Sequence, residues 1–253
     1  MTFARSWTLR RKLLEFYWGL ERRMVPGLEY SQHRYEEHLK RWIPDGVHWL
    51  DVGCGRRLLP SWRAEGERLL RARTRLLVGI DLDLDSLKDN VTADVRIFSP
   101  VSALPFREAS FDIVTANMVV EHLEDPGASF AEVARVLKPG GLFLFHTPNA
   151  QAFPTALARM VPEAVKAPLA RVLDGRKSMD VFQTWYRCNT AEDVHRAAQA
   201  AGLVPVEVSF VSSTAIFSVV PPLAFLELLW LRRVQDESRR HLRSNLIAVL
   251  RKS

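Results

Sequence analysis

The sequence predicts an α/β protein with a doubly wound, mostly parallel sheet of seven strands, helices on both faces and a helical insertion. Two observations support this fold class. From Val47 onward short apolar runs alternate with helical stretches, which is the pattern of βαβ units. The 253 residues are 47% hydrophobic and 25% charged, which is the composition of a globular chain with one sizeable core.

Residues 1–44 are expected to form a helical lid, with a break at Pro26 and a second helix over Ser31–Trp42. Residues 45–149 are expected to form the core of the sheet. The predicted strands are Val47–Val52, Leu76–Asp81, Val95–Phe98, Phe111–Asn117 and Gly141–His146. The predicted crossover helices are Leu58–Ala72, Leu84–Asn90 and Gly127–Leu137.

Residues 150–189 predict an inserted, basic, amphipathic helical segment. Residues 190–253 are expected to complete the sheet and to contain an apolar helical segment at 221–234. The predicted elements are a helix over Thr190–Ala201 and strands over Leu203–Ser212 and Asn245–Arg251.

Composition narrows the class of protein. Cys54 and Cys188 lie far apart and cannot supply the thiolates of a structural zinc site, so a reducing, cytoplasmic location is expected. No signal peptide is predicted. Pro221 and Pro222 interrupt the longest apolar stretch, which argues against a membrane span. The net charge of +6 favours acidic partners such as anionic lipid, nucleic acid or a charged substrate.

The sharpest local feature is a predicted buried strand that runs into a turn with two glycines, Gly53 and Gly55. Glycines let a backbone approach a ligand closely, although a purely structural turn has the same pattern. A dinucleotide site would have a third glycine where Leu58 stands, and Asp51 would repel a pyrophosphate. The turn therefore suits a ligand with an ammonium group.

A second carboxylate, Asp81, ends the next predicted strand, near the spacing at which an acid meets ribose hydroxyls. A carboxylate can accept both hydrogen bonds of a vicinal diol. The alternative is a helix N-cap without a ligand. Together, the glycine turn and this acid predict a nucleoside site with a dipolar tail.

Five ordered motifs now resemble class I S-adenosylmethionine-dependent methyltransferases, which implies a Rossmann-like fold and this cofactor. The motifs are Asp51-Val-Gly-Cys-Gly55, Gly79-Ile-Asp81, Leu104-Pro-Phe106, Ser110-Phe-Asp112 and Arg135-Val-Leu-Lys-Pro-Gly-Gly141. The resemblance covers about Val47 to Asn149. Glu121-His122-Leu123 and Thr147-Pro148-Asn149 are most similar to the small-molecule branch that includes ubiquinone O-methyltransferases.

The resemblance implies a role for each motif residue. Asp51, Gly53, Cys54 and Gly55 would line the methionine end, Asp81 the ribose and Leu82 the adenine, while Asn117 and Met118 would flank the methionine. The chain departs from the family at Arg57, where a glycine is usual, and at Pro100, where an acid usually meets the adenine amine. The adenine contacts would then come from the Val101 backbone and Ser102.

Methyl transfer depends mainly on alignment, and a base is needed only when the acceptor carries a proton. His122, just after the fourth predicted strand, and His146, at the end of the fifth, are the candidate bases, with His122 preferred. Each is equally a histidine that hydrogen-bonds a neighbouring loop. The other histidines show no spacing typical of metal ligands, so no metal is expected.

The acceptor side is less defined. Phe182, Trp185 and Tyr186 are candidates to line an acceptor pocket, with core packing as the alternative. The basic amphipathic segments favour a small or lipid-linked hydroxyl acceptor and peripheral contact with an anionic membrane. Two other functions stay open: a non-catalytic S-adenosylmethionine-binding regulatory protein, and an RNA or protein methyltransferase. The absence of an Asn-Pro-Pro-Tyr motif argues against nucleic acid.

Overall fold

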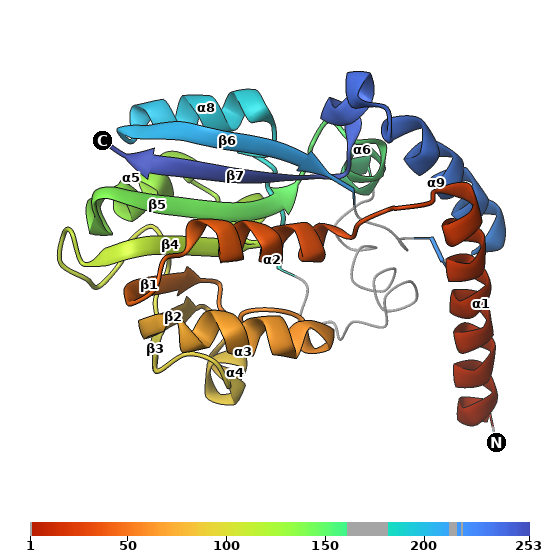
Figure 1. Ribbon diagram of the computed structural model, residues 1–253, viewed down its shortest axis with the longest axis horizontal. Coiled ribbons are helices and arrows are strands. Elements are labelled where there is room, and N and C mark those ends of the chain that lie inside the picture. Colours follow the sequence, from red (N-terminus) through yellow and green to blue (C-terminus); the bar gives the residue numbers. More distant parts are fainter. Residues whose placement is uncertain (1, 161–181, 213–216, 219) are drawn as a thin grey trace. The chain divides into compact units, whose positions relative to one another are not determined.

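The computed structural model describes residues 2–160, 182–212, 217–218 and 220–253, and it confirms the predicted α/β class (Figure 1). Within these ranges seven strands form one sheet in the order β3-β2-β1-β4-β5-β7-β6. The strands are β1 (Val47–Val52), β2 (Thr74–Asp81), β3 (Val95–Phe98), β4 (Phe111–Asn117), β5 (Leu137–Pro148), β6 (Leu203–Val211) and β7 (Asn245–Lys252). Strands β1 to β5 pair in parallel, and β7 runs antiparallel to β5.

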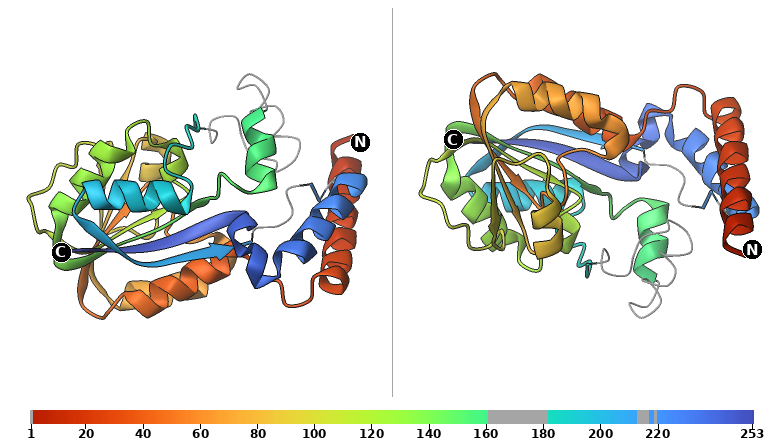
Figure 2. Two further views of the ribbon diagram at one scale, coloured as in Figure 1. Left: turned by 90° about the horizontal axis from the view of Figure 1, so that it is seen from above. Right: turned by 90° about the horizontal axis from the view of Figure 1, so that it is seen from below.

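The described residues also form helices in both units of the chain. They are α1 (Thr2–Met24), α2 (Ser31–Trp42), α3 (Ala64–Ala72), α4 (Leu84–Asp89), α5 (Pro126–Val136), α6 (Phe153–Met160), α8 (Ala191–Ala200) and α9 (Pro221–Val234), with 3-10 turns η1 (Ser61–Arg63), η2 (Val120–His122) and η4 (Glu237–Leu242). Figure 2 shows α5 and α8 on one face, and α2 and α3 on the other. No helix in the described part of the chain is long and apolar enough to span a bilayer.

The chain divides into two compact units. The sheet unit comprises Ser31–Ala150, Thr184–Ser209 and Asn245–Ser253, and the helical unit comprises Met1–Tyr30, Gln151–Gln183 and Phe210–Ser244. The sheet unit contains α2 to α5, α8 and nearly all of the sheet. The helical unit contains α1, α6, α9 and η4.

Burial explains why the sheet was predictable. The central strands carry fully buried side chains such as Leu50 in β1, Val114 in β4 and Leu144 in β5. Parallel strands covered on both faces read as nearly continuous apolar runs, which is the pattern that marked them in the sequence. The bounds of β1, β3, β4 and α2 agree with the prediction to the residue.

One helix boundary was wrong. The predicted helix Leu58–Ala72 is shorter, since η1 begins at Ser61 and α3 at Ala64. Leu58 and Leu59 are instead buried in the turn, where the backbone N–H of Leu59 donates to Glu67 Oε2 at 2.9 Å. Apolar periodicity alone does not distinguish such a buried turn from a helix.

β5 is longer than predicted, because it begins at Leu137 rather than Gly141. Leu137 already pairs with Phe111 of β4, and the register then shifts. The expected insertion at 150–189 is described only in part. Its first stretch contains α6, whereas residues 161–181 lie outside the described residues.

Candidate functional site

The site lies at the edge where the parallel strands β1, β2, β4 and β5 end. Asp51 of β1 stands level with Thr115 of β4, and Asn117 stands level with His146 of β5. In open α/β sheets this carboxyl-terminal edge is where ligands bind. The predicted polar residues of four strands therefore meet at one edge.

The glycine turn after β1 lets the backbone come close to a ligand. Gly53 has φ +65°, and a Cβ there would lie 2.3 Å from a methyl of Val119. Gly55 has φ +48°, and a Cβ there would meet nothing within 4 Å. Gly53 is therefore required for packing, whereas the space beside Gly55 is open.

Cys54 lies between these glycines, but its side chain is turned inward. It is buried, and a Cβ added to Gly79 would lie 2.7 Å from its Sγ. Burial raises the pKa of this thiol. The backbone N–H of Cys54 donates to the carbonyl of Ile80 at 3.0 Å. The thiol is therefore a packing group, and any ligand contact of Cys54 falls to its backbone.

Asn90 braces the turn, a role that the sequence did not indicate. Its Nδ2 donates to the carbonyl oxygens of Gly55 at 2.8 Å and Cys54 at 3.3 Å. Its Oδ1 accepts from the backbone N–H groups of Thr92 and Ala93. Because every polar atom of this amide is engaged, the turn is held in shape before a ligand arrives.

Asp51 is a buried carboxylate next to the turn. Thr115 Oγ1 donates to Asp51 Oδ1 at 2.7 Å and accepts from Trp49 Nε1 at 2.7 Å. Burial is the main cause that raises the pKa of Asp51 to about 7, and the Thr115 hydrogen bond lowers it in part. A carboxylate that is so poorly solvated favours a cationic ligand group.

The negative potential around Asp51 has further sources. Asp81 and Glu67 each raise the Asp51 pKa by charge repulsion. Glu67 also binds Arg57, whose Nη2 lies 3.1 Å from Glu67 Oε1. The unusual Arg57 therefore turns back toward the protein and pairs with a buried acid, which explains how the turn accommodates it.

Asp81 is the last residue of β2, and backbone N–H groups orient both of its carboxylate oxygens. Oδ2 accepts from the N–H of Gly55 at 2.8 Å, and Oδ1 accepts from the N–H of Asp83 at 2.9 Å. Each oxygen keeps lone pairs for further donors such as a vicinal diol. Leu82, which follows, is 55% exposed and offers apolar surface beside this carboxylate.

The expected adenine contacts lie after β3. Val101 is half-buried and lines an apolar void of about 10 Å³ with Val52 and Val119, which has no room for an adenine ring. Ser102 is exposed. A contact with adenine would therefore come from the outer side of this loop.

Asn117, the last residue of β4, faces α2, and Met118 follows it. The Asn117 amide exchanges two hydrogen bonds with the Gln32 amide, at 3.2 and 3.0 Å. Met118 adopts a positive φ of 60°, and its N–H donates to the carbonyl of His146 at 2.8 Å. No sequence pattern indicated Gln32, which covers this part of the strand edge.

His146, a predicted base, lies in the core. It is 1% exposed, its Nδ1 lies 2.9 Å from Asn117 Oδ1, and its ring stacks on Tyr35 at 5.6 Å. Burial, with a smaller contribution from His38, lowers the pKa of His146 to about 3. This environment argues against a role in accepting a proton from a substrate, because a buried imidazole with this pKa is a weak base.

His122, the preferred base, lies in η2 with 28% of its side chain exposed. Its Nε2 is 3.9 Å from Oε1 of buried Glu121, whose Oε2 accepts from Thr147 Oγ1 at 2.9 Å. The two predicted bases are therefore placed differently, and His122 is the one that solvent and a ligand can reach.

Two of the three predicted acceptor residues lie beside η2. The N–H groups of Trp185 and Tyr186 donate to the carbonyl of Glu121 at 2.8 and 3.1 Å. The Arg187 guanidinium lies 4.7 Å from the Trp185 ring. The third, Phe182, belongs to the helical unit and is 46% exposed.

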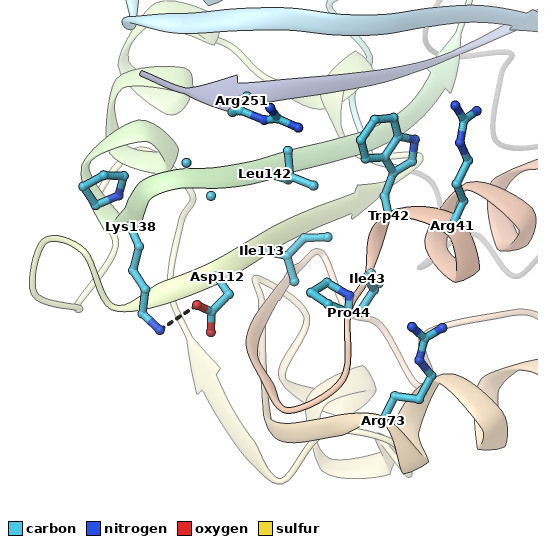
Figure 3. A pocket seen from close by; sticks show the side chains of 13 residues that line it. Arg41, Trp42, Ile43, Pro44, Arg73, Asp112, Ile113, Lys138, Leu142 and Arg251 are labelled. Carbon is cyan, nitrogen blue, oxygen red and sulfur yellow. Dashed lines mark hydrogen bonds and ion pairs between the residues drawn. The ribbon is translucent and has the colours of Figure 1, made fainter.

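A hollow of about 660 Å³ lies at the opposite edge of the sheet, near the amino-terminal ends of β4 and β5 (Figure 3). Four cations line it, namely Arg41, Arg73, Lys138 and Arg251. Three of them pair with acids: Lys138 with Asp112, Arg73 with Asp45, and Arg41 with Glu207. The first two pairs join residues near the amino-terminal ends of strands, whereas the third joins α2 to β6. The hollow is separate from the glycine turn. In the part of the chain that the structure describes, no three histidine, cysteine or acidic side chains are grouped to hold a metal ion.

Comparisons with known proteins agree with this geometry. The methyltransferase domain family profile matches residues 50–145. A ubiquinone biosynthesis O-methyltransferase of Paracidovorax citrulli is 32% identical over 175 residues, which are 63% of this chain and 68% of the relative. A malonyl-[acyl-carrier protein] O-methyltransferase of Erwinia billingiae is 33% identical over 131 residues, 51% of this chain and 49% of the relative.

Among solved structures, geranyl diphosphate C-methyltransferase from Streptomyces coelicolor, in complex with S-adenosyl-L-homocysteine, superposes with a TM-score of 0.55 at 15% identity. The alignment covers 88% of this chain and 78% of that one, and it supports the fold. The chain spans about half the length of the first curated relatives it matches. With its profile match, its relatives and its fold, the chain belongs to the class I methyltransferases, whose cofactor is S-adenosylmethionine.

Proposed function

We propose that this chain transfers a methyl group from S-adenosylmethionine to a hydroxyl of a small or lipid-linked acceptor, directly and without a metal. The observation that carries the proposal is the pair of carboxylates at the glycine turn. Asp51 is buried with a pKa of about 7, and Asp81 is oriented by the N–H of Gly55. One suits an ammonium group and the other a ribose diol, and the cofactor has both.

The residues at the turn fit this cofactor. Asp51 and the backbone of Gly53, Cys54 and Gly55 would hold the methionine end, and Asp81 the ribose. Leu82, Val101 and Ser102 would meet the adenine, while Asn117 and Met118 would flank the methionine. When bound, S-adenosylmethionine supplies a methyl group on a positively charged sulfur. The chain then has to orient the acceptor and exclude water.

His122 is the proposed base for an acceptor hydroxyl. Its imidazole is partly exposed, and the buried Glu121 lies 3.9 Å away, close enough to stabilise the charge of a protonated ring. His146 is the weaker candidate, because its ring is buried in the network with Asn117 and Tyr35. An acceptor that carries no proton would need neither histidine.

Trp185 and Tyr186 are proposed to contact the acceptor, since their backbone is anchored on the residue next to His122. Phe182 stays a prediction, because it belongs to the other unit. The names of two curated relatives, both O-methyltransferases, support oxygen as the acceptor atom. Peripheral contact with an anionic membrane and a cytoplasmic location belong to the same proposal.

Two alternatives remain separate outcomes of the test. A regulatory protein would bind S-adenosylmethionine without turnover, and Arg57 and Pro100 motivate this alternative. An RNA or protein methyltransferase would use the positive net charge of +6.

The test is methyl transfer from radiolabelled S-adenosylmethionine to four fractions of a cell extract: lipids, small molecules, RNA and protein. The proposal expects label in the lipid or small-molecule fraction, in a product that is a methyl ether. Label in RNA or protein, or tight cofactor binding without label in any fraction, would overturn it in favour of the corresponding alternative.

A further inference from the structure

Helix α9 is apolar on the side that the described part of the helical unit leaves exposed. Ala224, Leu228 and Leu231 follow helical spacing and pack on Tyr17 of α1 and on Val25, which follows α1 in the sequence. Helix α1 lies beside α9 in Figures 1 and 2. Four further apolar side chains of α9, Leu223, Phe225, Leu226 and Leu229, are 42, 46, 58 and 43% exposed. A surface helix normally has polar residues there. We call these four residues the α9 outer face.

The exposed charges near this face are mostly cationic. Glu227, the acid within α9, is buried and accepts from Tyr17 Oη and the N–H of Phe217, each at 3.2 Å. Arg232 and Arg233 lie in the last turn of α9 and are both exposed, and they line a hollow with Arg239 and one acid, Asp236. Over residues 10–24 of α1, four exposed cations, Arg11, Lys12, Arg22 and Arg23, accompany one exposed acid, Glu15. A partner for this surface should therefore be apolar inside and anionic at its boundary.

The first turn of α9 is suited to an apolar environment. The first N–H groups of a helix have no partner within the helix, and they are costly to bury in lipid. Pro221 and Pro222 occupy these positions and have no N–H, and the N–H of Ala224 donates to the carbonyl of Val220 at 2.9 Å. Among the first four residues of α9, only Leu223 therefore has a backbone N–H without an acceptor inside the helix.

We propose that the α9 outer face docks on the surface of an anionic lipid bilayer, with Arg232 and Arg233 on the lipid phosphates. An interfacial helix places its apolar side at the boundary of headgroups and acyl chains, and cations beside it are attracted by anionic lipid. A second copy of this chain would present the same cations, so charge complementarity favours lipid. The role of this docking rests on the proposed function, because it would bring the chain to the surface that holds a lipid-linked acceptor. The binding itself requires no turnover.

The experiment is flotation of the full chain with phosphatidylcholine vesicles, with and without phosphatidylglycerol. The wild type is expected to float with the anionic vesicles. Phe225→Ser combined with Leu226→Ser is expected to weaken this partitioning about tenfold or more, because two apolar contacts are lost. The matched control is Leu69→Ser in α3, which removes a leucine that is 45% exposed in the sheet unit and should leave partitioning unchanged.

A second variant tests the charge. Arg232→Gln combined with Arg233→Gln is expected to lower partitioning to anionic vesicles severalfold without disturbing the apolar packing of α9. The proposal is overturned if the wild type fails to float, or if the serine variant floats equally well. It is also overturned if the serine variant changes the sedimentation mass instead, which would make the face an interface between copies. All vesicle measurements are made without S-adenosylmethionine, so a failure of methyl transfer leaves their outcome intact.

Discussion

The strand edge of the sheet unit has two halves that are built differently. Where β1 and β2 end, a glycine turn lies beside two carboxylates, Asp51 and Asp81. A Cβ at Gly55 would meet nothing within 4 Å. At β4 and β5 helix α2 covers the edge, and Gln32, Asn117, His146 and Tyr35 form one connected network. The first half is the proposed cofactor site, whereas the polar groups of the second half bind each other.

The difference shows that position along a strand does not decide chemical role. His122 follows β4 and His146 lies near the end of β5 at the same edge, yet one is partly exposed and the other is buried with a pKa of about 3. Asp51 and Asp81 also differ in burial, since Asp51 is 5% exposed and Asp81 is half-buried. Four experiments test the difference between the two halves.

The largest effect is expected at Asp81. Asp81→Ala removes the acceptor of two backbone N–H groups and of the proposed ribose hydrogen bonds, each of which involves a charged group. We expect cofactor affinity to fall about 10²-fold or more. Calorimetric titration measures this, and Asp85→Ala, an exposed acid in α4, serves as the matched control. Unchanged affinity with an intact fold would remove Asp81 from the site.

The next effect concerns turnover. His122→Ala is expected to lower kcat about 10²-fold if the acceptor carries a proton, while cofactor affinity stays close to that of the wild type. The control is His195→Ala, an exposed histidine in α8. Steady-state rates with the identified acceptor decide the outcome. Full activity of the His122 variant would mean that the base lies elsewhere or that none is used.

A smaller effect is the pH dependence of binding. The ammonium group of the cofactor stabilises ionised Asp51, so binding releases a proton below the Asp51 pKa of about 7. Affinity should therefore fall about tenfold per pH unit below 7 and level off above it. Asp51→Asn should bind weakly with a flat profile. A wild-type profile that is flat from pH 5 to 8 would contradict the charged pairing.

The smallest effect is on the stability of the ligand-free protein. The pKa of His146 is lowered from 6.5 to about 3, so the unfolded state binds more protons and stability falls as pH drops below 6.5. The pKa of Asp51 is raised from 3.8 to about 7, so stability falls as pH rises from 3.8 toward 7. The two slopes oppose each other in the wild type.

Single variants should separate these slopes. His146→Gln is expected to leave a protein that loses stability between pH 5 and 7, and Asp51→Asn one that gains stability over the same interval. Each change should be on the order of 2 kcal/mol, since one pKa unit corresponds to about 1.4 kcal/mol. Urea unfolding at several pH values measures this. Parallel pH profiles for both variants would mean that neither group titrates as its burial implies.

The cofactor half was predictable because its signals are local. Strand β1 reads as an apolar run, and Gly53, Gly55 and Asp81 mark turns and strand ends whose geometry follows from nearby residues. The family resemblance then supplied roles that spacing alone left open. Thr115 and Asn90, which orient Asp51 and the turn, were missed because hydrogen bonds across 64 and 35 residues leave no local pattern.

The other half was less predictable for the same reason. Gln32 and Tyr35 reach the edge from α2, which the sequence marked as a helix without indicating which strands it would cover. That covering is what buries His146, so the two histidines looked alike in sequence. The outer face of α9 was hidden too, since an apolar run reads the same whether it is covered or exposed.

The most direct test of the central claim is calorimetric titration of the full chain with S-adenosylmethionine and, in parallel, with NAD. The glycine turn with Asp51 and Asp81 predicts binding of S-adenosylmethionine at one site per chain and no detectable binding of NAD, whose pyrophosphate Asp51 would repel. Binding of NAD with equal or higher affinity, or no heat with S-adenosylmethionine, would contradict the assignment of this edge as a methyl-donor site.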